Sequence, residues 1–397
     1  MNSKTLEREG LKNQVTTIDE FVALIQDWYK NNTKINPDFP RGFKDMFDNA
    51  VSGVNPIPSG TDPSVVYNWQ NATIDTLCSF FKDWYAWNPD LTTGLDYIQK
   101  FSWLYYENEA GLAFVGNDSG REMTYQFVEL NGAKMDSSES LPLVQKWEAE
   151  IGSGMDEYII PAGGYKNFNE FFKRELKDGM RPISSPQDSS VLVSPADAVV
   201  NMIEDNLTLD TKLQVKTQKL DIKQLLNNSP LADRFVGGTA LSCILMPDVY
   251  HRYHSPIDGI IVESNEDVAG NYFGIKDFPE LIHGGNVGYG YDYSVFEHFR
   301  RGYMIIKTKE YGHIAMIPVG LNTIASVIFK DEYKNLPSGS NIPIKKGDEV
   351  GWFQYGGSLN ILLFEEGVFP SVRIPQGQML GKLNKKTSNS TRAEFTF

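Results

Sequence analysis

The sequence has few cysteines, no long apolar run and a deficit of positive charge. Its two cysteines, Cys78 and Cys243, lie far apart and form no Cys-x-x-Cys pair, which excludes a dense disulfide framework and a cysteine-based structural zinc site. No apolar run approaches the roughly 18 residues that span a bilayer, so we expect no transmembrane segment. The formal net charge of -14 disfavours nucleic acid and anionic membrane surfaces as partners.

The opening residues lack the apolar stretch of a secretory signal, and the low cysteine content fits a reducing compartment. We therefore expect a soluble, cytoplasmic protein. With 41% hydrophobic and 12% aromatic residues the chain can bury a substantial core, and a length of 397 residues is typical of two domains.

The sequence has two regions with different residue patterns. In residues 1–160, segments such as TIDEFVALIQDWYK predict helices, because Thr17 and Glu20 have capping-box spacing and the apolar residues that follow repeat on one helix face. In residues 165–397, short apolar runs alternate with turn residues and predict antiparallel strands; examples are SVLVSPADAVVNMI, TALSCILM, DGIIVES, RGYMIIKT, GHIAMIPVG and TIASVIF. The prediction is an α+β protein, with a helical N-terminal domain followed by a mostly antiparallel β domain.

Two of the five histidines lie close together, as His251 and His254 in MPDVYHRYHSPIDG. A pair at this spacing could ligate a metal, but no cysteine or third histidine is near enough in the sequence to complete a tetrahedral set, so we predict no metal site. On this segment alone, ordinary hydrogen-bonded loop histidines are the alternative.

The segment FQYGGSLNILLF places Gly356, Gly357 and Ser358 inside what otherwise reads as a strand. Glycine in such a place marks a turn, a bulge or a close backbone approach. One interpretation is a hairpin turn. The other is that the peptide bond between Gly357 and Ser358 is itself a reactant.

Asp197, in VSPADAVV, lies between two apolar runs, where a carboxylate is costly unless it has a partner such as a histidine ring nitrogen. The alternative is that this segment simply forms a turn. Ser358 as nucleophile, a histidine as base and Asp197 as orienting group would together suit acyl chemistry. The esterase motif G-x-S-x-G is not met, because Leu359 and Asn360 follow the serine, so a plain hydrolase is the weaker interpretation.

Six segments, spread over roughly residues 165–380, together resemble the phosphatidylserine decarboxylase family in order and spacing. They are NEFFKRELKDGMRPI, VSPADA, DIKQLL, LMPDVYHRYHSPIDG, IPVGLNTIASV and IKKGDEVGWFQYGGS. The helical N-terminal region resembles the additional domain of a soluble branch of that family, which includes a fungal L-tryptophan decarboxylase.

This resemblance implies a proenzyme that cuts its own chain between Gly357 and Ser358 into fragments 1–357 and 358–397. Ser358 would become a pyruvoyl group, with His254 as base and Asp197 holding the tautomer of that histidine. The pyruvoyl ketone would form a Schiff base with a substrate amine, so that the α-carboxylate leaves as CO2. His251 would return a proton to Cα, although the roles of the two histidines could be exchanged.

Three departures from the family pattern bear on the substrate. The cleavage site reads Gly-Gly-Ser-Leu instead of Leu-Gly-Ser-Thr, Ala198 stands where a glycine is usual, and FEHFRRGYMII replaces an Asn-Glu-Arg segment. With the negative net charge, these features favour a free amino acid such as tryptophan as substrate. Phosphatidylserine, giving phosphatidylethanolamine, is the alternative. The segments WLYYENEAGLAFV and GNVGYGYDYSVF could line an aromatic pocket or simply pack.

Two interpretations without catalysis stay open. Leu359 is unusual at the cleavage site, so the chain could be a non-cleaving homologue that acts as a binding protein. The segment IPIKKGDEVGWF, with Lys345 and Lys346 before a turn, is similar to the hairpin of lipoyl and biotinyl carrier domains, although the family resemblance includes it as scaffold. Chain cleavage would separate these interpretations from the enzyme. A homodimer is expected from the family resemblance only.

Overall fold

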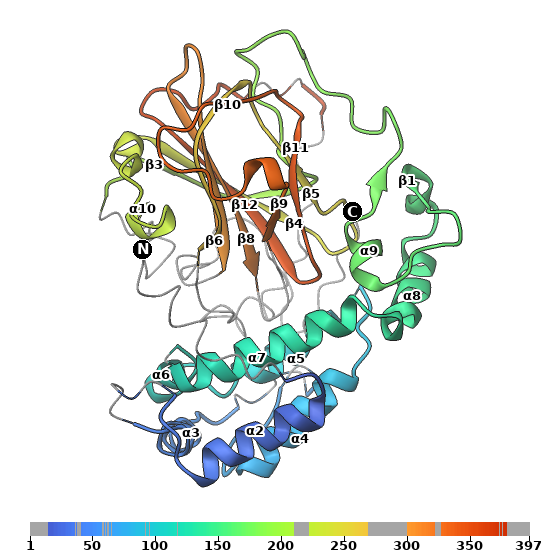
Figure 1. Cartoon of the computed structure of the whole chain (residues 1–397), viewed down its shortest axis with the longest axis vertical. Coiled ribbons are helices and arrows are strands. Elements are labelled where there is room, and N and C mark those ends of the chain that lie inside the picture. Colours follow the sequence, from blue (N-terminus) through green and yellow to red (C-terminus); the bar gives the residue numbers. More distant parts are fainter. Residues whose placement is uncertain are drawn as a thin grey trace. The chain divides into compact units, whose positions relative to one another are not determined.

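The structure is a computed structural model that describes residues 15–378, except for 36, 38–40, 58, 60, 62, 65, 92, 95, 117, 210–221, 269–299, 322–326, 373 and 375. It divides into two compact units (Figure 1). Unit 1 comprises Met1–Pro56, Tyr67–Asn88 and Trp103–Lys134, and unit 2 comprises Ile57–Val66, Pro89–Ser102 and Met135–Phe397. In the part of the chain that is described, no helix has the length and apolar character needed to cross a membrane. The cytoplasmic location and the functional domain limits stay predictions.

Unit 1 is helical. Its helices are α2 (Ile18–Lys30), α3 (Phe43–Ser52), α4 (Ile74–Ala86), α6 (Glu109–Gly116) and α7 (Asp118–Met135). The predicted capping box begins α2, where the Thr17 hydroxyl accepts from the Glu20 N–H at 3.1 Å and the Glu20 carboxylate accepts from the Thr17 N–H at 3.2 Å.

Aromatic rings fill the interior of unit 1. Phe21, Phe81 and Phe127 contact one another with ring centroids 4.7 to 5.7 Å apart. Tilted and edge-on pairs at this spacing each contribute about 0.5–1.5 kcal/mol beyond the burial of their area. Packing of this kind is typical of a stable helical unit without cross-links.

Unit 2 begins with short helices and a small two-stranded sheet. These elements are α5 (Asp96–Ser102), the 3₁₀ turn η1 (Ser138–Ser140), α8 (Leu141–Ile151), the 3₁₀ turn η2 (Gly152–Glu157), β1 (Tyr158–Ile159), α9 (Phe168–Phe172) and β2 (Glu175–Leu176). Further short helical segments, α10 (Ile222–Leu225), η3 (Ala232–Phe235) and η5 (Asp331–Tyr333), connect the strands that follow.

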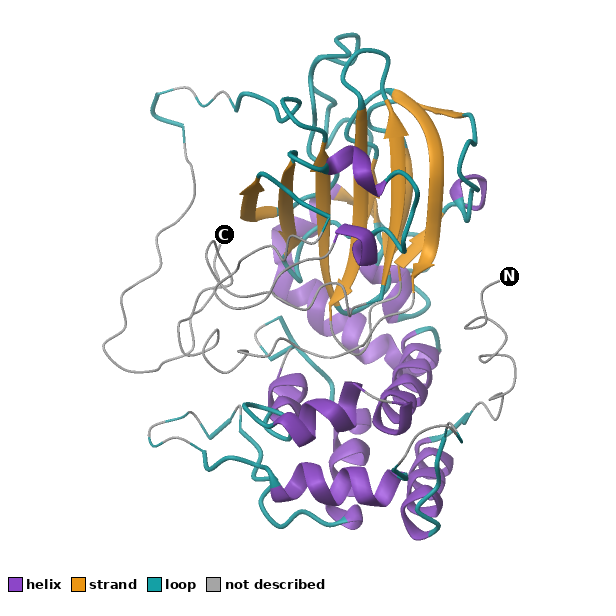
Figure 2. Ribbon diagram, turned by 90° about the vertical axis from the view of Figure 1, so that its left-hand side faces the viewer, coloured by secondary structure: helices purple, strands orange, loops and turns teal. Residues whose placement is uncertain are grey.

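Seven strands of unit 2 form one sheet, which Figure 2 shows as neighbouring orange arrows. Across the sheet the order is β10 (Ile342–Ile344), β6 (Gly259–Val268), β7 (Arg301–Lys307), β8 (His313–Leu321), β12 (Gly357–Phe364), β4 (Thr239–Leu245) and β3 (Val199–Asp205). A second sheet has the order β5 (Arg252–His254), β11 (Glu349–Phe353) and β9 (Val327–Phe329). The strand pairs in both sheets are antiparallel, which confirms the predicted α+β fold.

β12 lies in the interior of the larger sheet, between β8 and β4, and its residues from Ser358 to Phe364 are buried. Its apolar run is nearly continuous because both faces of the strand are covered. β11 pairs in the other sheet, so residues 354–356 cross between two sheets. The interpretation of Gly356–Ser358 as a hairpin turn is therefore wrong.

Parts of several sequence features lie outside the described residues. These parts are the aromatic segment at 285–296, residues 296–299 of FEHFRRGYMII, residue 221 of DIKQLL, residues 322–326 of the TIASV region and residues 379–397 of the expected short fragment.

Candidate active site

Ser358 lies near the start of β12 and is 1% exposed. Its strand neighbours are Leu245 on β4 and Gly320 on β8. The Ser358 Oγ lies 3.3 Å from the Gly356 carbonyl oxygen and 3.5 Å from the His251 Nδ1. A hydroxyl has one proton to donate, so these two acceptors compete for it. The contact with His251 is long, as catalytic hydrogen bonds often are before the reaction.

His251 presents an unprotonated nitrogen to the serine. Its Nε2 lies 3.2 Å from the Pro247 carbonyl oxygen, which can only accept, so Nε2 carries the ring proton and Nδ1 keeps a free lone pair. The side chain is 1% exposed. Burial lowers the pKa of His251 to about 3, and the positive charge of Arg174 acts in the same direction. The ring is therefore neutral at ordinary pH and can accept a proton from Ser358.

Arg174 holds the turn that orients His251. Its guanidinium donates to the carbonyl oxygens of Asp248 at 2.6 Å and Val249 at 3.0 Å. It also stacks on the rings of Tyr158 and Phe171, with its central carbon 4.2 and 4.9 Å from their centroids. The turn at 247–249 thus receives hydrogen bonds from both Arg174 and the His251 ring.

Phe172 contacts both the histidine and the chain just before the serine. Its ring stacks on the His251 ring, with centroids 3.8 Å apart and planes inclined by 20°. It meets the Tyr355 ring edge-on at 5.5 Å. Because one rigid ring touches both groups, the last residue of α9 sets the position of the His251 ring relative to the Gly356–Ser358 segment.

Tyr355 anchors the chain on the N-terminal side of the Gly357–Ser358 bond. Its ring also meets Phe168 of α9 edge-on at 5.1 Å and Trp147 of α8 at 5.9 Å. Its N–H donates to the Asn169 Oδ1 at 3.0 Å. Gly356 follows with φ of 146°, a conformation that residues with a Cβ rarely adopt. The chain is thus fixed at Tyr355 and turns sharply before entering β12.

His254 and Asp197 lie elsewhere in the structure. The His254 Nδ1 donates to the Gly347 carbonyl oxygen at 2.9 Å, and its Nε2 accepts from the Tyr250 hydroxyl at 3.0 Å. Burial lowers the pKa of His254, so this ring too is held neutral. The Asp197 carboxylate pairs with Arg181 at 2.7 to 3.1 Å.

The arrangement therefore differs from the predicted one, in which Asp197 orients His254 and His254 activates Ser358. Among the contacts of the described residues, His251 is the histidine at the serine, and Asp197 reaches neither histidine through its side chain. The VSPADA and His254 segments still touch, because the His254 N–H donates to the Pro195 carbonyl oxygen at 2.8 Å. The catalytic roles of all four residues stay predictions.

Sequence reasoning missed Arg174, Phe172 and Tyr355. Arg174 and Phe172 lie in the segment NEFFKRELKDGMRPI, which carried part of the family resemblance, and Tyr355 precedes the Gly-Gly-Ser tripeptide. Each was visible in the sequence as a member of a motif, but no periodicity indicated its contacts. Within the described residues there is no group of three or more His, Cys, Asp or Glu side chains that could hold a metal ion.

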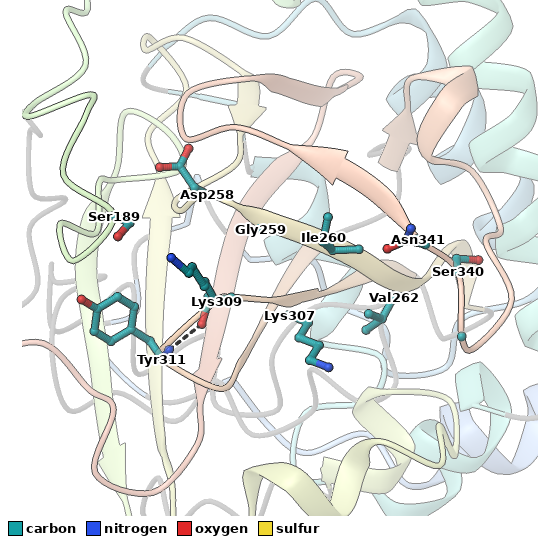
Figure 3. Close-up of a pocket in the computed structure, with 12 residues that line it drawn as sticks. Ser189, Asp258, Gly259, Ile260, Val262, Lys307, Lys309, Tyr311, Ser340 and Asn341 are labelled. Atoms are coloured by element: carbon teal, nitrogen blue, oxygen red, sulfur yellow. Dashed lines mark hydrogen bonds between the residues drawn. The ribbon is translucent and has the colours of Figure 1, made fainter.

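Unit 2 also has a surface groove of about 820 Å³ (Figure 3). Asp258, Ile260 and Val262 of the β6 region, Lys307 at the end of β7, and Ser340 contribute to its lining. Ser358, His251, His254 and Asp197 do not line it. The reactive arrangement is therefore a buried one, and the groove is a separate feature of the surface.

The residues around Ser358 fit a pyruvoyl group made from the serine. The hydroxyl is buried beside a neutral histidine, and Gly356, two residues earlier, has a positive φ that brings its carbonyl oxygen within 3.3 Å of the serine hydroxyl. A break before Ser358 leaves residues 358–364 paired with both neighbouring strands. The new chain end would therefore stay in place within the sheet.

Comparison with known proteins points to one family. Residues 168–385 match the family model described as phosphatidylserine decarboxylase. The phosphatidylserine decarboxylase proenzyme of Fusobacterium nucleatum is 34% identical over 235 residues, which cover 59% of this chain and 72% of that protein. The proenzyme of Clostridium novyi is 32% identical over 248 residues, which cover 60% and 75%. Proenzyme 3 of Schizosaccharomyces pombe is 32% identical over 237 residues, which cover 60% of this chain but 23% of that longer protein.

Fold, site and comparisons together define a pyruvoyl-dependent carboxy-lyase whose prosthetic group arises by self-cleavage. The chain belongs to the phosphatidylserine decarboxylase family. The predicted family is thereby confirmed. The resemblance to the branch with a fungal tryptophan decarboxylase stays a prediction.

Proposed function

We propose that the protein cuts itself between Gly357 and Ser358 and then decarboxylates phosphatidylserine to phosphatidylethanolamine. The observation that carries the proposal is the Ser358 hydroxyl beside the unprotonated Nδ1 of a buried histidine, at the start of an interior strand. The substrate comes from the relatives, which are named for phosphatidylserine. They give no support to the preference for a free amino acid predicted from the sequence.

The first step is proton transfer. When the Ser358 hydroxyl turns from the Gly356 carbonyl to His251, Nδ1 takes its proton and Oγ attacks the Gly357 carbonyl carbon. The bond from that carbon to the Ser358 nitrogen breaks, and the departing nitrogen takes the proton back from His251. Burial disfavours the charged imidazolium, so the ring returns this proton readily. The chain is then joined through an ester at Ser358. Removal of the Ser358 α-proton breaks the Cβ–Oγ bond, so that Gly357 leaves as a carboxylate and residue 358 becomes dehydroalanine. Its imine tautomer takes up water and releases ammonia, which leaves the pyruvoyl group at the new N-terminus.

The neighbouring residues favour this step by position. Tyr355 and Gly356 hold the Gly357 carbonyl at the end of a fixed segment, and β8 and β4 hold Ser358 from the other side. When both the attacking hydroxyl and the carbonyl are held in position, less conformational entropy is lost in reaching the transition state, and this is how proximity speeds a reaction.

In the decarboxylation, the pyruvoyl ketone supplies a carbonyl that condenses with the substrate amine and accepts the electrons left behind by CO2. His251 lies within reach of residue 358 and can hold the proton that Cα needs. On this assignment one histidine serves both reactions, whereas the family resemblance divided them between His251 and His254. His254 and Asp197 then act by fixing the segments around the site.

Intact mass measurement of the purified protein, with and without hydroxylamine, tests the proposal. We expect two chains that meet at Gly357–Ser358, the shorter with a trappable carbonyl, and one uncut chain for Ser358→Ala. Release of CO2 is then compared for phosphatidylserine in non-ionic detergent micelles, free serine and free tryptophan. A wild-type chain that stays uncut, or normal turnover by Ser358→Ala, would contradict self-cleavage, and turnover of a free amino acid alone would contradict the lipid substrate.

A further inference from the structure

Asn360 is a buried amide two positions after Ser358. Its side chain is 0% exposed. Side chains alternate along a strand, so Asn360 and Ser358 share one face of β12 and lie about 6.6–6.8 Å apart along it. The residue opposite Ser358 on β8 is Gly320, which has no side chain to separate the two.

Neither the Nδ2 nor the Oδ1 of Asn360 has a hydrogen-bond partner among the described residues. The strand neighbours directly opposite are Cys243 and Pro318. Pro318 offers no donor, and burial raises the pKa of the Cys243 thiol to about 11, so this group is a neutral, weak donor. An amide with no partner in such a place destabilises the fold unless a bound group satisfies it.

We propose that the Asn360 amide binds the α-carboxylate of the substrate, with Nδ2 as donor; this assignment rests on the proposed function. A substrate attached at residue 358 through its amine presents its α-carboxylate within a few ångströms of that residue. A carboxylate only accepts hydrogen bonds, and Nδ2 has two hydrogens to donate.

A neutral donor also suits the reaction better than a cation would. The carboxylate leaves as uncharged CO2, so its negative charge is lost in the transition state. A buried ion pair would stabilise the bound substrate more than the transition state, which slows the chemical step. An amide fixes the direction of the carboxylate with a smaller ground-state preference.

The first test uses Asn360→Leu, which keeps the approximate volume and removes both polar atoms. In a Ser358→Ala background, where no pyruvoyl forms, we expect the melting temperature to rise by about 2–4 °C because an unpartnered amide is removed. A fall would show that the amide has partners within the protein and would overturn the proposal.

The cut enzyme supplies the second measurement, with rates expressed per mole of hydroxylamine-trapped pyruvoyl. Asn360→Leu is expected to lower kcat/KM about ten- to hundredfold, with KM affected more than kcat. Ile361→Leu, one residue further and on the opposite face of β12, is the matched control and should stay within about twofold. A value for Asn360→Leu as close to wild type as this control would overturn the proposal.

Asn360→Asp separates donation from acceptance. Burial raises the pKa of a carboxyl, and only its protonated form can donate. We expect activity to return as pH falls below that pKa and to be lost above it, whereas Asn360→Leu shows no such added transition. If the amide oxygen instead accepted from the substrate amine, Asn360→Asp would be active at neutral pH, which would overturn the assignment.

Comparing substrates identifies which substrate group Asn360 binds. An equal loss in Asn360→Leu for micellar phosphatidylserine and for any free amino acid that is turned over supports the α-carboxylate that these substrates share. A loss of activity with the lipid alone would mean that the amide binds the phosphate, and it would overturn the proposal. Failure of the proposed function can be told apart from failure of the Asn360 assignment. If the proposed function is wrong, the wild-type chain is uncut or inactive. If only the Asn360 assignment is wrong, the wild-type chain is cut and active, and the Asn360 variants give the contrary results described above.

Discussion

The two sides of the Gly357–Ser358 bond are held by different means. After the bond, residues 358–364 pair with β8 and β4 in the interior of a seven-stranded sheet. Before the bond, Tyr355 is held by three aromatic rings from α8 and α9 and by the hydrogen bond that its N–H donates to the Asn169 Oδ1. Gly356, at φ of 146°, lies between the two supports. Such a bond can break while both of its flanks keep their contacts.

The largest expected effect is on the serine side, through the choice of base. His251→Ala should slow self-cleavage about 10²- to 10⁴-fold, because it removes the group that we propose accepts the serine proton. His254→Ala should cut within about tenfold of wild type, since its ring contacts are Tyr250 and Gly347. Fragment formation is followed by gel and mass over time after refolding. The reverse order of the two variants would restore His254 as the base.

An intermediate effect is expected on the other side of the bond. Tyr355→Ala removes the ring that fixes the segment before Gly356 and should slow self-cleavage about ten- to hundredfold, the cost of a misplaced reacting group. Tyr355→Phe keeps the ring contacts and is the matched control, with a rate near that of wild type. The same time course measures both. Equal rates for Ala and Phe would mean that the aromatic contacts do not position the bond.

The smallest expected effect is on how the free energy of unfolding changes with pH. It tests whether His251 is buried. Its folded pKa, about 3, lies below the ordinary value of about 6.5, so the unfolded chain binds more protons between these values. Stability should therefore fall as pH decreases from 6.5 toward 3, by up to about 1.4 kcal/mol per pH unit from this group.

The measurement is urea unfolding of Ser358→Ala and of Ser358→Ala/His251→Phe at pH 7 and pH 4.5. The double variant should lose less stability on acidification, whatever its stability at pH 7. Equal losses would mean that His251 titrates normally and is not buried as described.

The sequence could predict the fold class and the residue types of the site because both leave local signals. The capping box at Thr17 and Glu20, the alternating strands after residue 165 and the motif around Ser358 are all short-range patterns. It could not predict which histidine faces the serine. His251 and His254 are three residues apart. The His251 ring is oriented by the turn at 247–249, which Arg174 holds from more than 70 positions away, and the His254 ring by Tyr250 and Gly347.

The sequence could not predict the contacts of Tyr355 either, because they too join distant parts of the chain. Trp147 lies in a segment with clear helix signals, and its sequence pattern indicates a buried face without indicating what that face covers. Its partner is a tyrosine about two hundred positions further along the chain. Likewise, Asn360 is in the sequence simply one polar residue in an apolar strand. It is unusual only because its amide is buried and has no hydrogen-bond partner in the part of the chain that the structure describes.

If Ser358 is the residue that is converted, as we propose, the interior position of β12 also determines when the enzyme can become active. Ser358 and His251 are 107 residues apart in the sequence and meet only when β12 has inserted between β8 and β4. Contacts between such distant segments form late, after the loops between them have closed. A chain that is still folding, or has misfolded, keeps an ordinary serine at position 358. On this proposal, self-cleavage reports the completion of folding, one molecule at a time, and the fraction of cut chain measures how much of a preparation has reached the native sheet.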